Sequence, residues 1–89
     1  MTAITYALLA VVATRAGDRT AASRHLDAAH RHSRTTARRE RQLVEIAALI
    51  VSGNDTRARG LAIEHASEFP MDSEILDSIL HGTAIERES

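Results

Sequence analysis

A pattern that recurs after 36 positions constrains the fold of this chain more than any other feature. Each copy consists of an apolar run, a turn of the Gly-Asp or Gly-Asn type, and a second run rich in alanine. The two turns are Gly17-Asp18 and Gly53-Asn54. A helical hairpin that repeats at about this period is typical of stacked α-helical repeats. Such repeats present binding surfaces and seldom carry out chemistry.

The apolar spacing and the turn residues predict five helices and no strand. A glycine at position 17 can take the left-handed conformation that ends a helix, and Asp18 can cap the next one. No stretch has the sustained period-2 alternation of a strand. The fold class is therefore predicted to be all-α. The expected helices span residues 3–16, 19–33, 37–52, 56–68 and 73–84.

The 89 residues are predicted to form a single small domain. The first repeat takes about 3–36, the second about 37–72 and a C-terminal helix about 73–84, with a frayed tail at 85–89. Alanine supplies much of the apolar content, and each alanine buries little area. The core is therefore expected to be thin, which favours support from a second chain.

The two copies share the residues of a known repeat. In that repeat, a large residue, a leucine and a small residue on the first helix are followed by the glycine turn and by inward alanines. The positions that match are Tyr6, Leu9, Ala10, Gly17, Asp18, Ala22 and Ala29 in the first copy, and Gly53, Ala58 and Pro70 in the second. In these residues the chain resembles the tetratricopeptide repeat (TPR) superfamily.

A second set of residues narrows the resemblance. The stretch from Arg39-Glu40-Arg41 to Phe69-Pro70-Met71-Asp72 is similar to a divergent bacterial branch of the superfamily. The resemblance implies a TPR-like stack of two antiparallel helical hairpins plus a C-terminal capping helix. The chain departs from the repeat where Arg34 replaces a proline, at Gln42, Glu45 and Ile46, and at His65, which stands at a small position.

Charge is distributed unevenly along the chain. Residues 1–41 hold eight arginines and three acids, whereas residues 42–89 hold three arginines and nine acids. One end of the molecule is therefore expected to be basic and the other acidic. This asymmetry favours head-to-tail or antiparallel association, or a charged partner.

Five arginines within eleven residues are the candidate charged binding site. They are Arg31, Arg34, Arg38, Arg39 and Arg41. Three interpretations stay open: a solvated helix junction paired with Glu40 and Glu45, contact with the acidic patch of a partner, which can be the C-terminal half of the same protein, and contact with nucleic acid phosphates. No aromatic residue lies among the arginines and no helix-turn-helix motif is evident, so nucleic acid is the least favoured.

Apolar residues at both ends of the chain are the candidate self-association surface. Isolated repeats need neighbours, and nothing in the sequence covers the outer side of the first helix. We therefore expect a homodimer. The residues expected at this interface are Ile4, Leu8, Val11, Ile75, Ile79 and Leu80.

No motif predicts catalysis, a cofactor or a metal site. No two of the five histidines have the i, i+3 or i, i+4 spacing that a helical zinc site uses. His65 is expected to be a hydrogen-bonded, partly buried histidine. The acids Asp72, Glu74 and Asp77 are interpreted as caps that complement the dipole of the last helix.

The preferred function is that of a protein-interaction module or small scaffold, self-associating and without catalysis of its own. The first alternative is a nucleic-acid-associated or transcription-linked domain that uses the arginines. The second is a small-ligand binder or enzyme that uses His65 or Tyr6 in a pocket between helices. The chain has no cysteine, and its longest apolar run is about ten residues, so we expect a cytoplasmic protein that does not cross a membrane.

Overall fold

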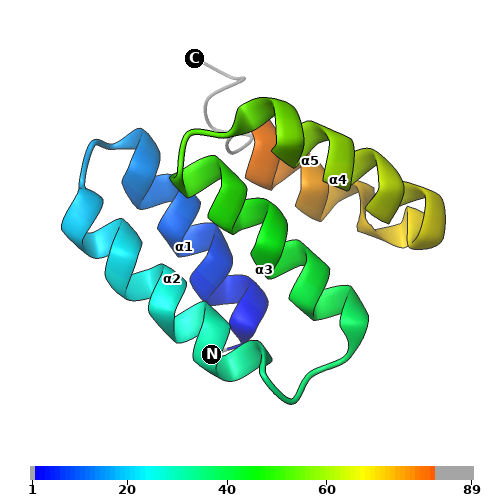
Figure 1. Ribbon diagram of the computed structural model, residues 1–89, viewed down its shortest axis with the longest axis horizontal. Helices are drawn as coiled ribbons and strands as arrows, with labels where there is room; N and C mark the ends of the chain where they lie inside the picture. Colours follow the sequence, from blue (N-terminus) through cyan, green and yellow to red (C-terminus); the bar gives the residue numbers. More distant parts are fainter. Residues whose placement is uncertain (1, 82–89) are drawn as a thin grey trace.

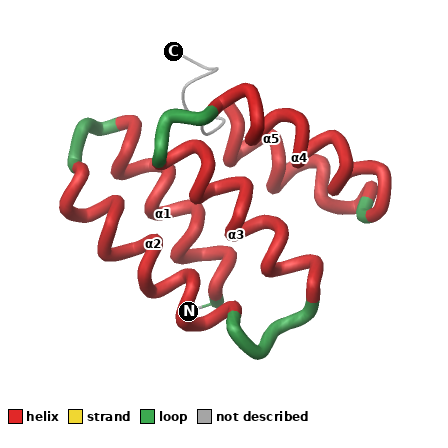
Figure 2. Tube along the Cα trace, viewed as in Figure 1, coloured by secondary structure: helices red, strands yellow, loops and turns green. Residues whose placement is uncertain are grey.

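Residues 2–81 form five α-helices and one short 3₁₀-helix in the computed structural model, and this part of the chain contains no strand (Figures 1 and 2). The predicted all-α class is confirmed. The elements are α1 (Ala3–Arg15), α2 (Arg19–Ser33), α3 (Arg38–Val51), α4 (Asp55–Glu68), η1 (Pro70–Asp72) and α5 (Ser73–His81).

The helix boundaries lie within one or two residues of the predicted ones for the first four helices. Gly17 and Gly53 have φ angles of +81° and +83°, so both end their helices in the left-handed conformation. Asp18 caps α2 by accepting a hydrogen bond of 3.0 Å from the amide of Ala21. The last predicted residues of the fifth helix, 82–84, and the tail at 85–89 lie outside the described residues.

Helix α3 is the centre of the molecule. The hairpins α1–α2 and α3–α4 follow one another, α1, α2 and α3 run side by side, and α4 and α5 form one end (Figure 1). Helix α3 packs against α1, α2, α4 and α5, and five of its side chains are buried. They are Leu43, Val44, Ile46, Ala47 and Ile50.

Small residues let α1 approach its neighbours closely. Ala3, Ala7 and Ala10 are at most 2% exposed, and α1 packs mainly against α2 and α3. The C-terminal end of α1 also reaches α5, because the Arg15 guanidinium donates a hydrogen bond of 2.8 Å to the Ile79 carbonyl. A cation at this position satisfies a carbonyl that the last turn of α5 leaves unpaired.

Gly60 lies at an open position of α4, where an added Cβ would meet nothing within 4 Å. The sequence interpretation of one acidic residue is wrong. Asp72 is not a cap of the last helix, although its position in the sequence predicts one. Instead it ends η1, and its carboxylate binds Arg39 and His65.

The glycines give a matched test of the turn geometry. Gly53→Ala is expected to lower the free energy of unfolding by about 1–2 kcal/mol, because alanine is strained at positive φ. Gly60→Ala, in an exposed helical position, is expected to raise it by about 1 kcal/mol. Urea denaturation followed by circular dichroism measures both. A neutral Gly53→Ala variant would contradict the left-handed turn.

Candidate functional site

A buried pair of ionisable side chains lies where α3, α4 and η1 meet. His65 on α4 is 0% exposed and Asp72 at the end of η1 is 1% exposed. The His65 Nε2 lies 2.7 Å from Asp72 Oδ2, and its Nδ1 lies 2.7 Å from Gln42 Oε1. The Phe69 ring also lies near the imidazole, with ring centroids 4.8 Å apart.

The Asp72 carboxylate receives a second set of hydrogen bonds from α3. Arg39 Nε donates to both carboxylate oxygens, at 3.0 and 2.8 Å, and its Nη2 donates to Oδ1 at 2.5 Å. A two-pronged guanidinium–carboxylate contact is strong because it combines charge with fixed geometry. Among the described residues, no buried side-chain nitrogen or oxygen lacks a partner. We call Arg39, Gln42, His65 and Asp72 the buried polar cluster.

The buried polar cluster connects elements of the fold. Its histidine and carboxylate resemble an acid–base pair, but both side chains are closed off from solvent. A general base must come within hydrogen-bond reach of the proton that it removes. In this arrangement, the cluster joins α3 to α4 and to η1, and so fixes where α5 begins.

The cluster predicts how stability depends on pH. The hydrogen bonds from Arg39 are the main reason that the pKa of Asp72 lies below its usual value; His65 lowers it further, and burial opposes both. Ionised Asp72 therefore stabilises the fold at pH values above about 3.9, which is the pKa of an aspartate in the unfolded chain. This stabilisation is lost as the pH falls toward the lower pKa that Asp72 has in the folded protein.

We therefore expect the free energy of unfolding to decrease from pH 5 to pH 3 in urea denaturation. Carbon-13 NMR of the Asp72 carboxyl group would measure its pKa directly in the folded protein. A carboxyl that titrates at or above the ordinary aspartate value would contradict this account.

The predicted arginine site is divided by ion pairs within the chain. Arg38 binds Glu68 of α4 with both of its terminal nitrogens, and Arg39 binds Asp72. Arg41 donates a hydrogen bond of 3.0 Å to the Thr36 carbonyl. Two of the five arginines are thus paired with acids of the C-terminal half of the same chain.

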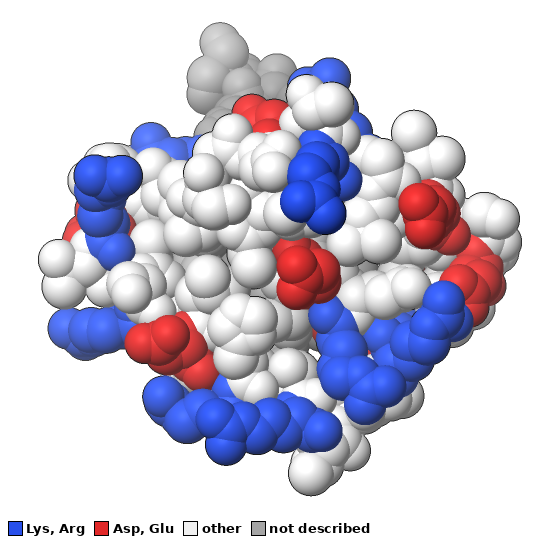
Figure 3. Space-filling model, viewed as in Figure 1, with Lys and Arg blue, Asp and Glu red and all other residues white. Residues whose placement is uncertain are grey.

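The other arginines of the set lie on the surface. Arg31 and Arg34 are exposed, as is Arg41. On the face drawn in Figure 3, basic side chains extend along the lower edge, and at the right they lie beside acidic ones. A role of the exposed arginines in binding a partner stays a prediction.

Two of the six residues predicted to form the apolar interface belong to the hydrophobic core. Val11 and Ile79 are 1% and 0% exposed, so the expectation that they face a partner is corrected. Each lies on the inward side of its helix, where the hydrophobic effect favours burial. Ile4, Leu8 and Ile75 are half-buried against the core, and Leu80 is half-buried at the rim of a groove.

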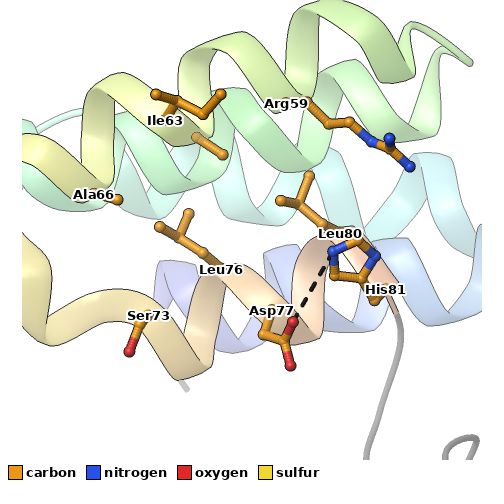
Figure 4. A pocket seen from close by; sticks show the side chains of 9 residues that line it. Arg59, Ile63, Ala66, Ser73, Leu76, Asp77, Leu80 and His81 are labelled. Atoms are coloured by element: carbon orange, nitrogen blue, oxygen red, sulfur yellow. Dashed lines mark ion pairs between the residues drawn. The ribbon is translucent and has the colours of Figure 1, made fainter.

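That groove runs between α4 and α5 and has a volume of about 420 Å³. Its walls are mainly apolar, and Figure 4 shows Ile63 on α4 opposite Leu76 and Leu80 on α5. Ile63 is 72% exposed. We call it the α4–α5 groove. Its lining residues are Arg59, Ala62, Ile63, Ala66, Ser73, Leu76, Asp77, Leu80 and His81.

The remaining histidines and Tyr6 lie apart from the buried polar cluster. Tyr6 stacks at an angle on His32, with ring centroids 5.0 Å apart, and lines a shallow hollow with His25. Within residues 2–81, no three histidine, aspartate or glutamate side chains are grouped so that they could hold a metal ion.

Sequence reasoning missed the partners of Gln42 and Asp72 and the exposure of Ile63. A signal for Gln42 was present, because Gln42 and His65 stand where the first copy has Tyr6 and Ala29. The two departures from the repeat complement each other, since Gln42 binds the His65 ring. No comparable signal marked Ile63, whose exposure depends on where α5 lies.

Comparison of the chain with models of known protein families, with curated proteins and with solved structures finds no match. In the described part of the chain, no helix has both the length and the apolar character that crossing a lipid bilayer requires.

Proposed function

We propose that this protein is a TPR-like interaction module that acts in the cytoplasm, associates with itself as a dimer and has no catalysis of its own. The observation that carries the proposal is the α4–α5 groove, an open apolar hollow with a 72% exposed isoleucine on its wall. In helical repeats, a neighbouring helix normally covers such a surface.

The energetics favour a covered groove. Complete burial of one isoleucine side chain contributes about 1.5–3 kcal/mol, and a dimer would bury two copies of Ile63. Because every 1.4 kcal/mol changes a dissociation constant tenfold, burial of the two isoleucines would strengthen self-association by about two orders of magnitude or more.

The buried polar cluster supports the same proposal. A histidine and an aspartate at 0% and 1% exposure suit a structural role better than a catalytic one. By joining α3 to α4 and η1, they hold α5 at the distance from α4 that opens the groove. The nucleic-acid alternative is weakened, because Arg38 and Arg39 already bind carboxylates of the same chain.

Static light scattering over a range of concentrations tests the proposal. The mass is expected to rise from the 9.7 kDa of one chain toward twice that value, and to stay high in concentrated salt because the contact is apolar. Ile63→Asp is expected to weaken the dimer at least tenfold.

Ser67→Asp is the matched control, since it places the same charge on an exposed position of α4 that does not line the groove. It is expected to leave the mass unchanged. A wild-type chain that keeps the mass of a monomer up to millimolar concentration would refute the proposal.

A further inference from the structure

We propose that a hollow between α1 and α2 binds an acidic helix of a partner protein. The hollow has a volume of about 370 Å³, and none of its lining residues lines the α4–α5 groove, so it is a second surface. We call it the α1–α2 hollow. Its lining residues are Tyr6, Arg24, His25, Asp27, Ala28 and Arg31.

The arginines at the α1–α2 hollow have no partner within the chain. Of the arginines predicted to bind a partner, Arg38 and Arg39 form ion pairs with acids of α4 and η1, and Arg41 bonds a backbone carbonyl. In the described part of the chain, by contrast, the side chains of Arg24 and Arg31 make no hydrogen bond or ion pair. An acidic partner can bind these two arginines without breaking a contact of the fold, and their charge steers its approach.

The charges along this face of α2 alternate in sign. Arg24, Asp27 and Arg31 stand at i, i+3 and i+7, so they follow one another on one side of the helix. The two arginines are seven residues apart, which is about 10 Å along the helix axis. A second helix that lies along α2 has the same rise per residue, so acids at its own positions i and i+7 come level with both arginines.

Asp27 excludes other acidic ligands from the same place. Its carboxylate stands between the two arginines in the sequence and lines the hollow with them. A single phosphate group held by both arginines would lie against this carboxylate, and like charges at close range repel. Two acids that are one above the other avoid Asp27, provided that the residues between them carry no negative charge.

The floor of the α1–α2 hollow suits an apolar side chain. Ala28 lines the hollow and is 7% exposed, so it forms part of the floor. Tyr6 forms the wall on the side of α1, where its ring packs against His32 of α2. On the partner helix, an apolar residue at i+4 lies on the same face as acids at i and i+7. It would enter the hollow between the two ion pairs, as in other complexes of a helix in a groove.

Two synthetic peptides test the register. Both are alanine-rich helices of equal charge with a leucine at i+4. The test peptide carries glutamates at i and i+7, and the control peptide carries its second glutamate at i+5, on another side of the helix. Fluorescence anisotropy of the labelled peptides measures both dissociation constants. The control peptide is expected to bind about fivefold more weakly, because only one of its glutamates can face an arginine.

Charge reversals on α2 test the residues. Arg24→Glu and Arg31→Glu are each expected to weaken binding of the test peptide about tenfold, because each change removes an attraction and adds a repulsion. Arg19→Glu is the matched control, since it makes the same charge change on α2 outside the α1–α2 hollow. It is expected to change binding less than about twofold at physiological ionic strength. Asp27→Ala is expected to tighten binding of a peptide in which glutamate replaces the leucine, relative to the wild-type protein.

The outcomes that would overturn the inference are distinct. Circular dichroism first confirms that each variant keeps the helical content of the wild type. Equal binding of the two peptides, equal effects of Arg19→Glu and Arg24→Glu, or no binding up to millimolar concentration would each contradict it. A single-stranded DNA oligonucleotide that displaces the test peptide at lower concentration would assign the surface to nucleic acid instead. None of these measurements depends on whether the chain is a dimer, so the inference and the proposed self-association can fail separately.

Discussion

Asp72→Ala is expected to lower the free energy of unfolding by about 3–5 kcal/mol, the largest effect of any single substitution considered for this chain. The side chain is 1% exposed and receives the hydrogen bonds of both Arg39 and His65. Its removal leaves a guanidinium and a buried ring nitrogen without their acceptor, and it disconnects η1 from α3 and α4. Small domains have a free energy of unfolding of about 5–15 kcal/mol, so the substitution would remove a large part of it.

Thermal and urea denaturation measure this loss. For a domain of this size, 1 kcal/mol corresponds to a shift of about 4–8 °C in melting temperature, so a fall of more than 12 °C is expected. Glu64→Ala, which removes an exposed carboxylate from α4, is the control and is expected to change stability by less than about 0.5 kcal/mol. Equal effects of the two substitutions would show that the buried ion pair does not hold these helices together.

His65→Ala is expected to cost about 3 kcal/mol or more. The imidazole is completely buried, so truncation leaves a cavity beside Phe69, and large-to-small changes of ring side chains cost about 3–5 kcal/mol. The substitution also removes the hydrogen-bond partner of Gln42 and one partner of Asp72. An acceptor left buried without a partner costs about 1–3 kcal/mol.

His65→Phe separates the two contributions. Phenylalanine keeps the bulk of a ring but has no nitrogen, so its cost reports mainly the two lost hydrogen bonds and is expected to be about 1–3 kcal/mol. Urea denaturation of His65→Ala, His65→Phe and the wild type measures the free-energy cost of the cavity and the cost of the lost hydrogen bonds. A His65→Phe variant as stable as the wild type would mean that His65 acts in the core only by filling space.

The helices were predictable because each has a local cause. Apolar periodicity and the glycines at positions 17 and 53 determine where the first four helices begin and end, and both glycines adopt the expected positive φ. The inward residues of the alanine-rich helices were also predictable. Ala22 and Ala29 lie two helical turns apart on α2, Ala58 occupies the position on α4 that corresponds to Ala22, and all three are buried. The assignment to the TPR-like branch stays a prediction.

The candidate site was less predictable because it depends on contacts between distant residues. Arg39 and Asp72 are 33 positions apart, and the sequence alone offers Glu40 and Glu45 as nearer partners for the arginines. Asp72 precedes a helix, which is the position of a typical cap, and only tertiary packing reveals that it faces inward. Likewise, Val11 and Ile79 belong to helices rich in apolar residues, and their burial depends on which neighbour each side meets.

Methyl NMR of the wild-type chain across a dilution series tests the central claim most directly, because it asks whether the α4–α5 groove is the surface that another chain covers. The account predicts that the methyl resonances of Ile63 and Leu80 move as the protein is diluted, while that of the buried Ile46 in α3 stays in place. If the Ile63 and Leu80 resonances stay unchanged while the measured mass rises with concentration, association occurs elsewhere on the molecule, and the assignment of the groove is contradicted.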